Sequence, residues 1–315
     1  MDGKFKEMKI IAGNSNIKLA KEIADHLEMN LTDASLKTFS DGEISFNLNE
    51  TVRGADVFVI QSTSYPVNNN LMELLISIDA MKRASAGRIN AVIPYYGYAR
   101  QDRKAKSRDP ITAKLVADLI TVAGADRVIT MDLHATQIQG FFDMPVDHLL
   151  GLPIIAEYYK SLNRDDLVVV SPDAGSVPRS RKLAEMLNSP LAIIDKRRPK
   201  ANVSEVMNII GDIKDKNCIL VDDMIDTAGT ICNGANALKQ MGAKSVFAAC
   251  THAVLSGPAV QRIKDSAIEE LVTLNTIDIP DEKFLDMFKV LSVGPIFAKA
   301  IERVHNSESV STLFD

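Results

Sequence analysis

The stretch ILVDDMIDTAGT, residues 219–230, decides the fold because it joins a strand, a turn and a helix within one short segment. Its apolar start is typical of a strand that is buried on both faces of a sheet, and this strand ends in Asp222 and Asp223. Small residues and hydroxyls then lead into a helix, whose first N–H groups have no partner within the helix itself. This order of elements indicates an α/β protein.

The same stretch predicts a binding site for a ribose phosphate. Unpaired N–H groups and the helix dipole favour a phosphate at the start of the helix. The carboxylates beside it can accept hydrogen bonds from vicinal sugar hydroxyls. An acidic turn with an N-capping threonine is the simpler interpretation, but it accounts for a bare Asp-Thr pair rather than for the whole string. The residues of the predicted site are Asp222, Asp223, Asp226, Thr227, Ala228, Gly229 and Thr230.

Short apolar runs bounded by turn residues recur on both sides of this stretch and predict further buried strands. They lie at residues 8–13, 55–62, 88–96, 126–133, 166–173, 190–195, 218–224 and 245–251. Segments with helical periodicity separate most of them, at residues 18–27, 71–84, 112–124, 181–188 and 230–242. Such alternation predicts mostly parallel sheets that are flanked by helices and joined by right-handed crossovers.

A weak internal repeat divides the chain into two copies of one α/β unit. Residues 11–27 match residues 169–187 in the order strand, polar turn and helix, and the acidic loop DDMIDT aligns with QSTSYP in the first half. We therefore expect two tandem domains, residues 1–148 and 149–303, with residues 304–315 as a tail that packs back on the first. Matches this loose also arise between unrelated βαβ units.

Composition excludes several classes of protein. Hydrophobic residues make up 46% and charged residues 24% of the 315 residues, as in an ordinary globular protein. A net charge of −5 gives no basic field for nucleic acid. Three cysteines without paired spacing argue against a disulfide framework, and no apolar stretch approaches the roughly 18 residues of a membrane helix. We expect a cytoplasmic protein with no nucleic acid or membrane as its partner.

Further motifs that are typical of one protein family occur along essentially the whole chain. They are YYGYARQDRK (95–104), DLHATQIQGFFDMPVD (132–147), VVVSPDAGSVPRSR (168–181), DKRRP (195–199) and ESVSTLF (308–314). Together with ILVDDMIDTAGT, which looks like the phosphoribosyl-binding motif of type I phosphoribosyltransferases, they make the chain resemble the ribose-phosphate pyrophosphokinase family. The resemblance implies a type I phosphoribosyltransferase-like fold. It also implies transfer of the β,γ-diphosphoryl group of ATP to the C1 hydroxyl of ribose 5-phosphate, with Mg²⁺ as cofactor.

The resemblance assigns roles to residues that follow the predicted strands. His134 and Asp173 would help to hold the Mg²⁺ bound to ATP, although imidazole is an unusual ligand for this cation. Lys196 and Arg198 would be catalytic. They lie two residues apart in a loop directly after an apolar run, so an extended backbone would point both at the migrating diphosphoryl group. A solvated basic loop is the simpler interpretation of this run.

The remaining assignments concern ATP and regulation. ATP would contact Phe39, Asp41, Glu43, Arg100, Gln101 and His134, the first three from a neighbouring subunit. Without the resemblance, Phe39 is read as a core residue and FSDGE as a hairpin turn. An allosteric site for the activator phosphate and the inhibitor ADP would use Arg53, Ser85, Arg108, Ser309, Val310, Ser311 and Phe314. This site would lie across subunit contacts and require a homo-oligomer, a hexamer in this family.

Two alternatives stay open from the residues alone. A phosphoribosyltransferase would contain ILVDDMIDTAGT equally well, but the doubled domain and DKRRP argue against it. A non-catalytic regulatory homologue, or a transcription regulator that uses the same fold as a sensor, belongs to a different class of function. Regulatory homologues carry an insertion after DKRRP, which is absent here.

Overall fold

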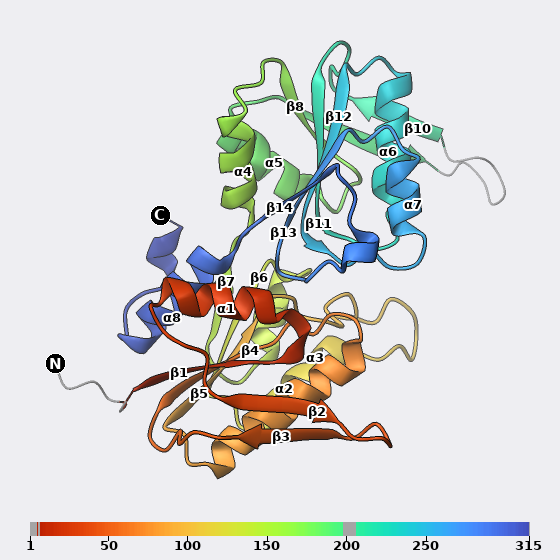
Figure 1. Ribbon diagram of the computed structural model, residues 1–315. Helices are drawn as coiled ribbons and strands as arrows, with labels where there is room; N and C mark the ends of the chain where they lie inside the picture. The colour runs from red at the N-terminus through yellow and green to blue at the C-terminus, as the bar shows by residue number, and fades with distance from the viewer. Residues whose placement is uncertain (1–4, 6, 198–205, 315) are drawn as a thin grey trace. The chain divides into compact units, whose positions relative to one another are not determined.

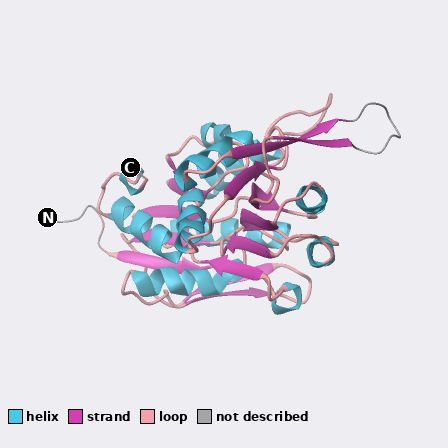
Figure 2. Ribbon diagram, turned by 90° about the horizontal axis from the view of Figure 1, so that it is seen from above, coloured by secondary structure: helices cyan, strands magenta, loops and turns pink. Residues whose placement is uncertain are grey.

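The computed structural model describes residue 5, residues 7–197 and residues 206–314, and they form two α/β units (Figure 1). Unit 1 comprises residues 1–150, 276–278 and 292–315, and unit 2 comprises residues 151–275 and 279–291. Figure 2 shows helices (cyan) beside strands (magenta) in this α/β arrangement. The fold class predicted from the sequence is confirmed. No helix of the described residues is long and apolar enough to cross a membrane.

Unit 1 contains a parallel sheet with the strand order β1-β4-β5-β6-β7. Its strands are β1 (Met8–Ala12), β4 (Asp56–Ile60), β5 (Arg88–Ile93), β6 (Arg127–Met131) and β7 (Val146–Leu149). A separate antiparallel pair is formed by β2 (Ala34–Thr38) and β3 (Ile44–Leu48). The helices are α1 (Ile17–His26), α2 (Val67–Arg83), α3 (Thr112–Ala123) and α8 (Gly294–His305), with 3₁₀ turns η1 (Asn14–Asn16), η2 (Thr136–Phe141) and η4 (Ser311–Leu313).

Unit 2 contains a larger sheet with the order β10-β9-β8-β11-β12-β13-β14, in which only the β10–β9 pair is antiparallel. Its strands are β8 (Leu167–Ser171), β9 (Leu191–Arg197), β10 (Val206–Ile210), β11 (Asn217–Ile225), β12 (Ser245–Ala253), β13 (Glu270–Leu274) and β14 (Phe288–Leu291). The helices are α4 (Leu152–Ser161), α5 (Val177–Leu187), α6 (Gly229–Gln240) and α7 (Ala259–Lys264), with a 3₁₀ turn η3 (Asp281–Lys283).

The two units share one order of elements, as the internal repeat suggested, although the antiparallel pair of unit 2 joins the main sheet through β9 and that of unit 1 does not. In each, the first parallel strand is followed in sequence by a helix and an antiparallel strand pair, and then by strands that add one after another to the same sheet. Thus β1, β4, β5, β6 and β7 correspond to β8, β11, β12, β13 and β14. Since ligands of open α/β sheets lie beyond the carboxyl ends of the strands, the loops after β8 and β11 are the ones to inspect in unit 2.

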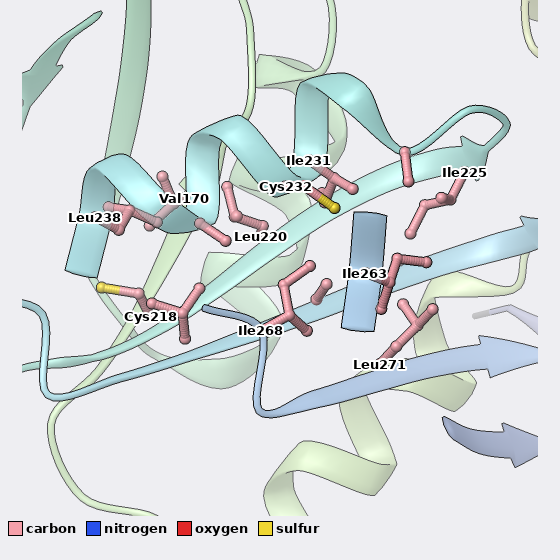
Figure 3. Close-up of a cluster of buried hydrophobic side chains, with 14 of the residues drawn as sticks. Val170, Cys218, Leu220, Ile225, Ile231, Cys232, Leu238, Ile263, Ile268 and Leu271 are labelled. Carbon is pink, nitrogen blue, oxygen red and sulfur yellow. The ribbon is translucent and has the colours of Figure 1, made fainter. Parts of the chain in front are cut away.

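The apolar runs of the sequence form the core of each unit. All eight runs contain a strand of the structure, and β4 is buried along its whole length. In unit 2, Leu220 of β11 and Val170 of β8 pack in one cluster with Ile231 and Leu238 of α6 (Figure 3). The cysteines lie in the same cluster and form no disulfide. Burial raises the pKa of the Cys218 thiol to about 11, so it is an inert core residue.

The predicted domain boundaries need correction at the C-terminal side. Residues 292–303 were placed in the second domain, yet they group with unit 1, and the first division falls after residue 150 instead of 148. Helix α8 packs against α1 and buries Phe297, Ile301 and Val304. The Arg88 guanidinium of β5 donates to the Val304 carbonyl at 2.9 Å. An amphipathic pattern shows that a helix covers a sheet, but not which of two similar sheets it covers.

Candidate functional site

The loop that follows β11 brings the predicted ribose phosphate residues together. Asp222 and Asp223 lie near the end of β11, and Asp223 is only 8% exposed. Ala228 takes a left-handed conformation with φ of 60°, and α6 begins at the next residue. Helix α6 has no side-chain cap among the described residues, so its first N–H groups are not covered by a capping side chain. The segment therefore places two carboxylates beside the start of a helix.

The carboxylate of Asp222 is held by its surroundings. Its Oδ1 accepts a hydrogen bond from the Ser176 hydroxyl at 2.9 Å and one from the Asp223 N–H at 2.9 Å. Burial, and secondarily the negative charge of Asp223, raise the pKa of Asp222 to about 7, while the Ser176 hydrogen bond opposes this rise. A raised carboxylate pKa of this kind is a feature of functional sites, because it disfavours the charged form in the absence of a ligand.

The loop between β8 and α5 reaches the same carboxylate. Asp173 follows β8, and its Oδ1 accepts the Ser176 N–H at 2.9 Å. The Ser171 hydroxyl donates to the Asp173 carbonyl at 2.7 Å. Ser176 therefore contacts both Asp173, the predicted metal residue, and Asp222, the predicted sugar residue. Sequence reasoning did not select Ser176, although its position just before the proline-containing start of α5 was a signal for a structured helix start.

The segment after β12 supports the β11–α6 loop. The Ser256 N–H donates to the Asp226 carbonyl at 3.0 Å, and the Ser256 hydroxyl bonds the Asp226 carboxylate. Arg262 of α7 donates from Nη1 to the Thr227 carbonyl at 3.0 Å. The sequence did not predict a role for Ser256 or Arg262. Nothing in the stretch SGPAVQR, residues 256–262, indicates contact with a loop 30 residues earlier.

The residues predicted to hold the metal lie in different units. His134 lies in the loop between β6 and η2 and is exposed, whereas Asp173 belongs to unit 2. The described part of the chain contains no group of three or more His, Cys, Asp and Glu side chains that could hold a metal ion. A carboxylate at the end of a parallel strand nonetheless fits Mg²⁺, which binds few protein oxygens and completes its shell with phosphate oxygens and water.

The predicted ATP residues other than His134 occupy two loops of unit 1. Phe39, Asp41 and Glu43 belong to the turn between β2 and β3, where the Phe39 N–H donates to the Glu43 carbonyl at 2.8 Å. The hairpin interpretation of FSDGE is confirmed, and the interpretation of Phe39 as a core residue is wrong, since it is 57% exposed. Arg100 and Gln101 follow β5, and Gln101 Oε1 accepts the Thr112 hydroxyl at the start of α3.

The predicted catalytic cations fall at the edge of the described residues. Strand β9 continues to Arg197, so Lys196 lies in the strand, where it pairs with Met207, and not in a loop directly after residue 195. Arg198 lies outside the described residues. The expectation of a loop directly after residue 195 is therefore wrong for the backbone of Lys196, because β9 continues through this residue.

The predicted allosteric residues separate into two groups. Ser309, Val310 and Ser311 line a cavity of about 430 Å³ together with Arg88 and Arg127. Arg53, Ser85 and Arg108 do not line this cavity. The Gly54 N–H next to Arg53 donates to the Ser85 carbonyl at 2.9 Å, which brings those two segments together. Phe314 is partly buried just after the η4 turn.

Comparison with known proteins covers both units. Residues 8–124 match the model for the N-terminal domain of ribose phosphate pyrophosphokinase, and residues 179–315 match that of the phosphoribosyl synthetase-associated domain. A ribose-phosphate pyrophosphokinase of Clostridium perfringens is 70% identical over 317 aligned residues, which cover 100% of this chain and 99% of the relative. The chain belongs to the ribose-phosphate pyrophosphokinase family. Its Bacillus subtilis member is 62% identical over 98% of both chains.

A solved structure agrees with this family assignment. The crystal structure of phosphoribosylpyrophosphate synthetase from Mycobacterium smegmatis superposes with a TM-score of 0.91 at 45% identity, over 96% of this chain and 100% of that one. The alternatives of a phosphoribosyltransferase and of a regulatory homologue are not favoured, because the relatives that match the full length are ribose-phosphate pyrophosphokinases.

Proposed function

We propose that this chain performs its family's reaction with ribose 5-phosphate bound to the β11–α6 loop of unit 2. The chain is a transferase that moves the diphosphoryl group of ATP to the C1 hydroxyl of ribose 5-phosphate, giving 5-phosphoribosyl 1-diphosphate and AMP. The observation that carries the placement of the sugar phosphate is the carboxylate pair near the end of β11, one buried and one partly buried, on the segment that leads into α6.

The phosphate and the ribose hydroxyls of the substrate each find suitable partners in this loop. The phosphate binds the N–H groups and hydroxyls of residues 226–230, where the dipole of α6 favours negative charge. The vicinal hydroxyls of the ribose donate to Asp222 and Asp223. The raised pKa of Asp222 favours the protonated carboxyl group in the free protein. Hydrogen bonds donated by the sugar stabilise the charged carboxylate, so binding favours loss of this proton.

ATP binds unit 1, with Phe39 stacking on the adenine and with Asp41, Glu43, Arg100 and Gln101 as polar contacts. An exposed ring on a hairpin turn supports the stacking role, since it is open to a base. His134 and Asp173 contribute to binding the Mg²⁺ of the nucleotide, directly or through its waters. Held there, Mg²⁺ would supply positive charge against the diphosphoryl oxygens. Lys196 and Arg198 stabilise the same group as charge redistributes over its oxygens.

Regulation and assembly follow the family's pattern in this proposal. Phosphate activates and ADP inhibits at a site formed by Arg53, Ser85, Arg108 and the tail from Ser309 to Phe314. The enzyme is a cytoplasmic homohexamer, in which the FSDGE turn of one copy completes the ATP site of another. The exposed position of this turn supports a role outside its own unit.

One incubation tests the reaction. The purified chain is mixed with ATP, ribose 5-phosphate and Mg²⁺, and products are followed by ³¹P NMR. We expect AMP and 5-phosphoribosyl 1-diphosphate to form in equal amounts, and EDTA to stop the reaction. Formation of ADP, or of AMP without the phosphoribosyl product, contradicts the proposal.

A further inference from the structure

The loop that binds the substrate phosphate carries negative charge of its own. Residues 222–230 contain Asp222, Asp223 and Asp226 and no lysine or arginine. A phosphate monoester carries a charge of about −1.5 to −2 at neutral pH. A helix terminus contributes only about half an elementary charge. Binding of ribose 5-phosphate to this loop therefore calls for a cation from elsewhere in the fold.

Arg262 brings such a cation to the loop. Its Nη1 donates to the Thr227 carbonyl at 3.0 Å. The same atom lies 3.4 Å from the point where a Cβ on Gly229 would stand, so the guanidinium extends along the backbone of residues 227–229. The Arg262 side chain is exposed, and the bond to Thr227 uses one of its five N–H donors. The others suit a phosphate, which a guanidinium can bind through two parallel hydrogen bonds.

The segment that carries Arg262 is fixed to the loop independently of this side chain. The Leu255 N–H donates to the Ile225 carbonyl at 3.0 Å, and Ser256 bonds both the carbonyl and the carboxylate of Asp226. Lys283 in turn donates to the Leu255 carbonyl at 2.9 Å. Helix α7 begins three residues after Ser256. The loop and the arginine are thus held in one arrangement before the substrate binds, which lowers the entropy cost of binding.

We propose that Arg262 binds the phosphate group of ribose 5-phosphate and supplies the positive charge that the β11–α6 loop lacks. The inference rests on the proposed placement of ribose 5-phosphate in this loop. It makes Arg262 a substrate-binding residue that holds the Thr227 carbonyl with one N–H and the substrate phosphate with others.

Three variants separate the charge of Arg262 from its support of the loop. Arg262→Gln keeps an N–H donor for the Thr227 carbonyl but removes the charge, Arg262→Lys keeps the charge, and Arg262→Ala removes both. We expect the KM for ribose 5-phosphate to rise roughly 10- to 100-fold in the Gln and Ala variants and less in the Lys variant. The KM for ATP should not change. Lys264→Gln, which removes one exposed charge from the same helix, is the matched control and should behave as wild type.

Binding alone provides a readout that does not depend on turnover. Calorimetric titration with ribose 5-phosphate should show the same order of affinities, and the ³¹P shift of the bound substrate should titrate at higher pH in Arg262→Gln than in wild type. A variant Arg262→Gln with wild-type affinity overturns the proposal and leaves Arg262 as support for the loop. If wild type binds ribose 5-phosphate but forms no AMP, the proposed reaction fails while this comparison still decides the role of Arg262.

Discussion

The loops at the ends of β4 and β11 have equivalent positions in the two units but different polar groups. An uncharged glutamine stands in the first loop, and a pair of aspartates stands in the second. When Gln61 is aligned with Asp222, Gln61 directly follows β4 and Asp222 lies near the end of β11. Both side chains accept a hydrogen bond from a serine in the preceding β–α turn. In unit 1 this serine is Ser15, whose hydroxyl donates to Gln61 Oε1 at 2.6 Å. In unit 2 it is Ser176, at 2.9 Å from Asp222. In both units, therefore, a serine of the first β–α turn is hydrogen-bonded to the residue at the end of the second parallel strand.

The groups around that connection differ. Gln61 Nε2 donates to Glu73 Oε2 at 2.7 Å and to the Asn70 carbonyl at 3.2 Å, so the amide is saturated by α2. The residue of α6 that aligns with Glu73 is Gly234, which has no side chain to offer. Unit 2 instead places Asp223 next to Asp222, a like-charge pair that opposes ionisation. One loop satisfies its own polar groups, and the other keeps carboxylates whose charge a ligand stabilises.

The largest effect should come from making the unit 2 loop resemble that of unit 1. Asp222→Asn gives it an uncharged amide that still accepts from Ser176, and it removes the charge that binds the ribose hydroxyls. We expect kcat/KM for ribose 5-phosphate to fall roughly 100-fold at pH 8, since hydrogen bonds to charged groups are the stronger ones. Steady-state kinetics measure this, with Asp212→Asn on the surface of unit 2 as control. A wild-type kcat/KM in Asp222→Asn would refute the sugar assignment.

The same variant should change the pH dependence of stability. The pKa of Asp222 is raised from 3.8 to about 7, so the free folded protein keeps a proton that the unfolded chain releases. The stability from this group is fully present below about pH 4 and is lost as the pH rises to about 7. One pKa unit corresponds to about 1.4 kcal/mol, so the loss amounts to a few kcal/mol, shared with Asp223.

Asp222→Asn should therefore be more stable than wild type at pH 8 and similar to it near pH 4. Calorimetric melting without ligand at the two pH values gives the comparison. A difference in melting temperature that is the same at both pH values would contradict the raised pKa.

We expect a smaller effect when a negative charge is introduced into the corresponding loop of unit 1. Gln61→Glu places a second carboxylate against the buried Glu73 and removes one of the donors to Glu73, while the backbone N–H and the side-chain amide of Asn14 still donate to it. We expect a loss of roughly 2 kcal/mol in unfolding free energy, from the lost hydrogen bonds of the amide and from like-charge repulsion. The loss should be greater at pH 8 than at pH 5, as measured by urea unfolding. Calorimetry should still count one ribose 5-phosphate per chain, and a second site would show that charge alone makes the ligand site.

The smallest effect concerns the serine common to both loops. Ser176→Ala removes one hydrogen bond from Asp222 while the Asp223 N–H continues to donate to it. We expect the KM for ribose 5-phosphate to rise about five-fold, the effect of about 1 kcal/mol. Ser176→Thr, which keeps the hydroxyl, should restore the wild-type value. Equal effects of the two variants would point to packing at the start of α5 rather than to the hydroxyl.

Sequence reasoning predicted the central strands because they are continuous apolar runs, such as that of β4, whose residues are all buried. It passed over β7 and β14, which lie at sheet edges with four residues each and mixed burial. It also passed over β13 (Glu270–Leu274), an inner strand whose sequence ELVTL mixes a glutamate and a threonine with its apolar residues. It grouped Asp222 with Asp223 correctly, since both lie in one short segment. It could not find Ser176 or Arg262, because their contacts join segments that only the folded sheet brings together.

A crystal structure of the protein with ribose 5-phosphate tests the central claim most directly. We predict one sugar phosphate per chain, with its phosphate on the N–H groups of residues 226–230, its vicinal hydroxyls on Asp222 and Asp223, and nothing at the Gln61 loop. A structure in which the sugar phosphate binds the Gln61 loop, or in which the β11–α6 loop is filled by the protein's own side chains, would contradict the account.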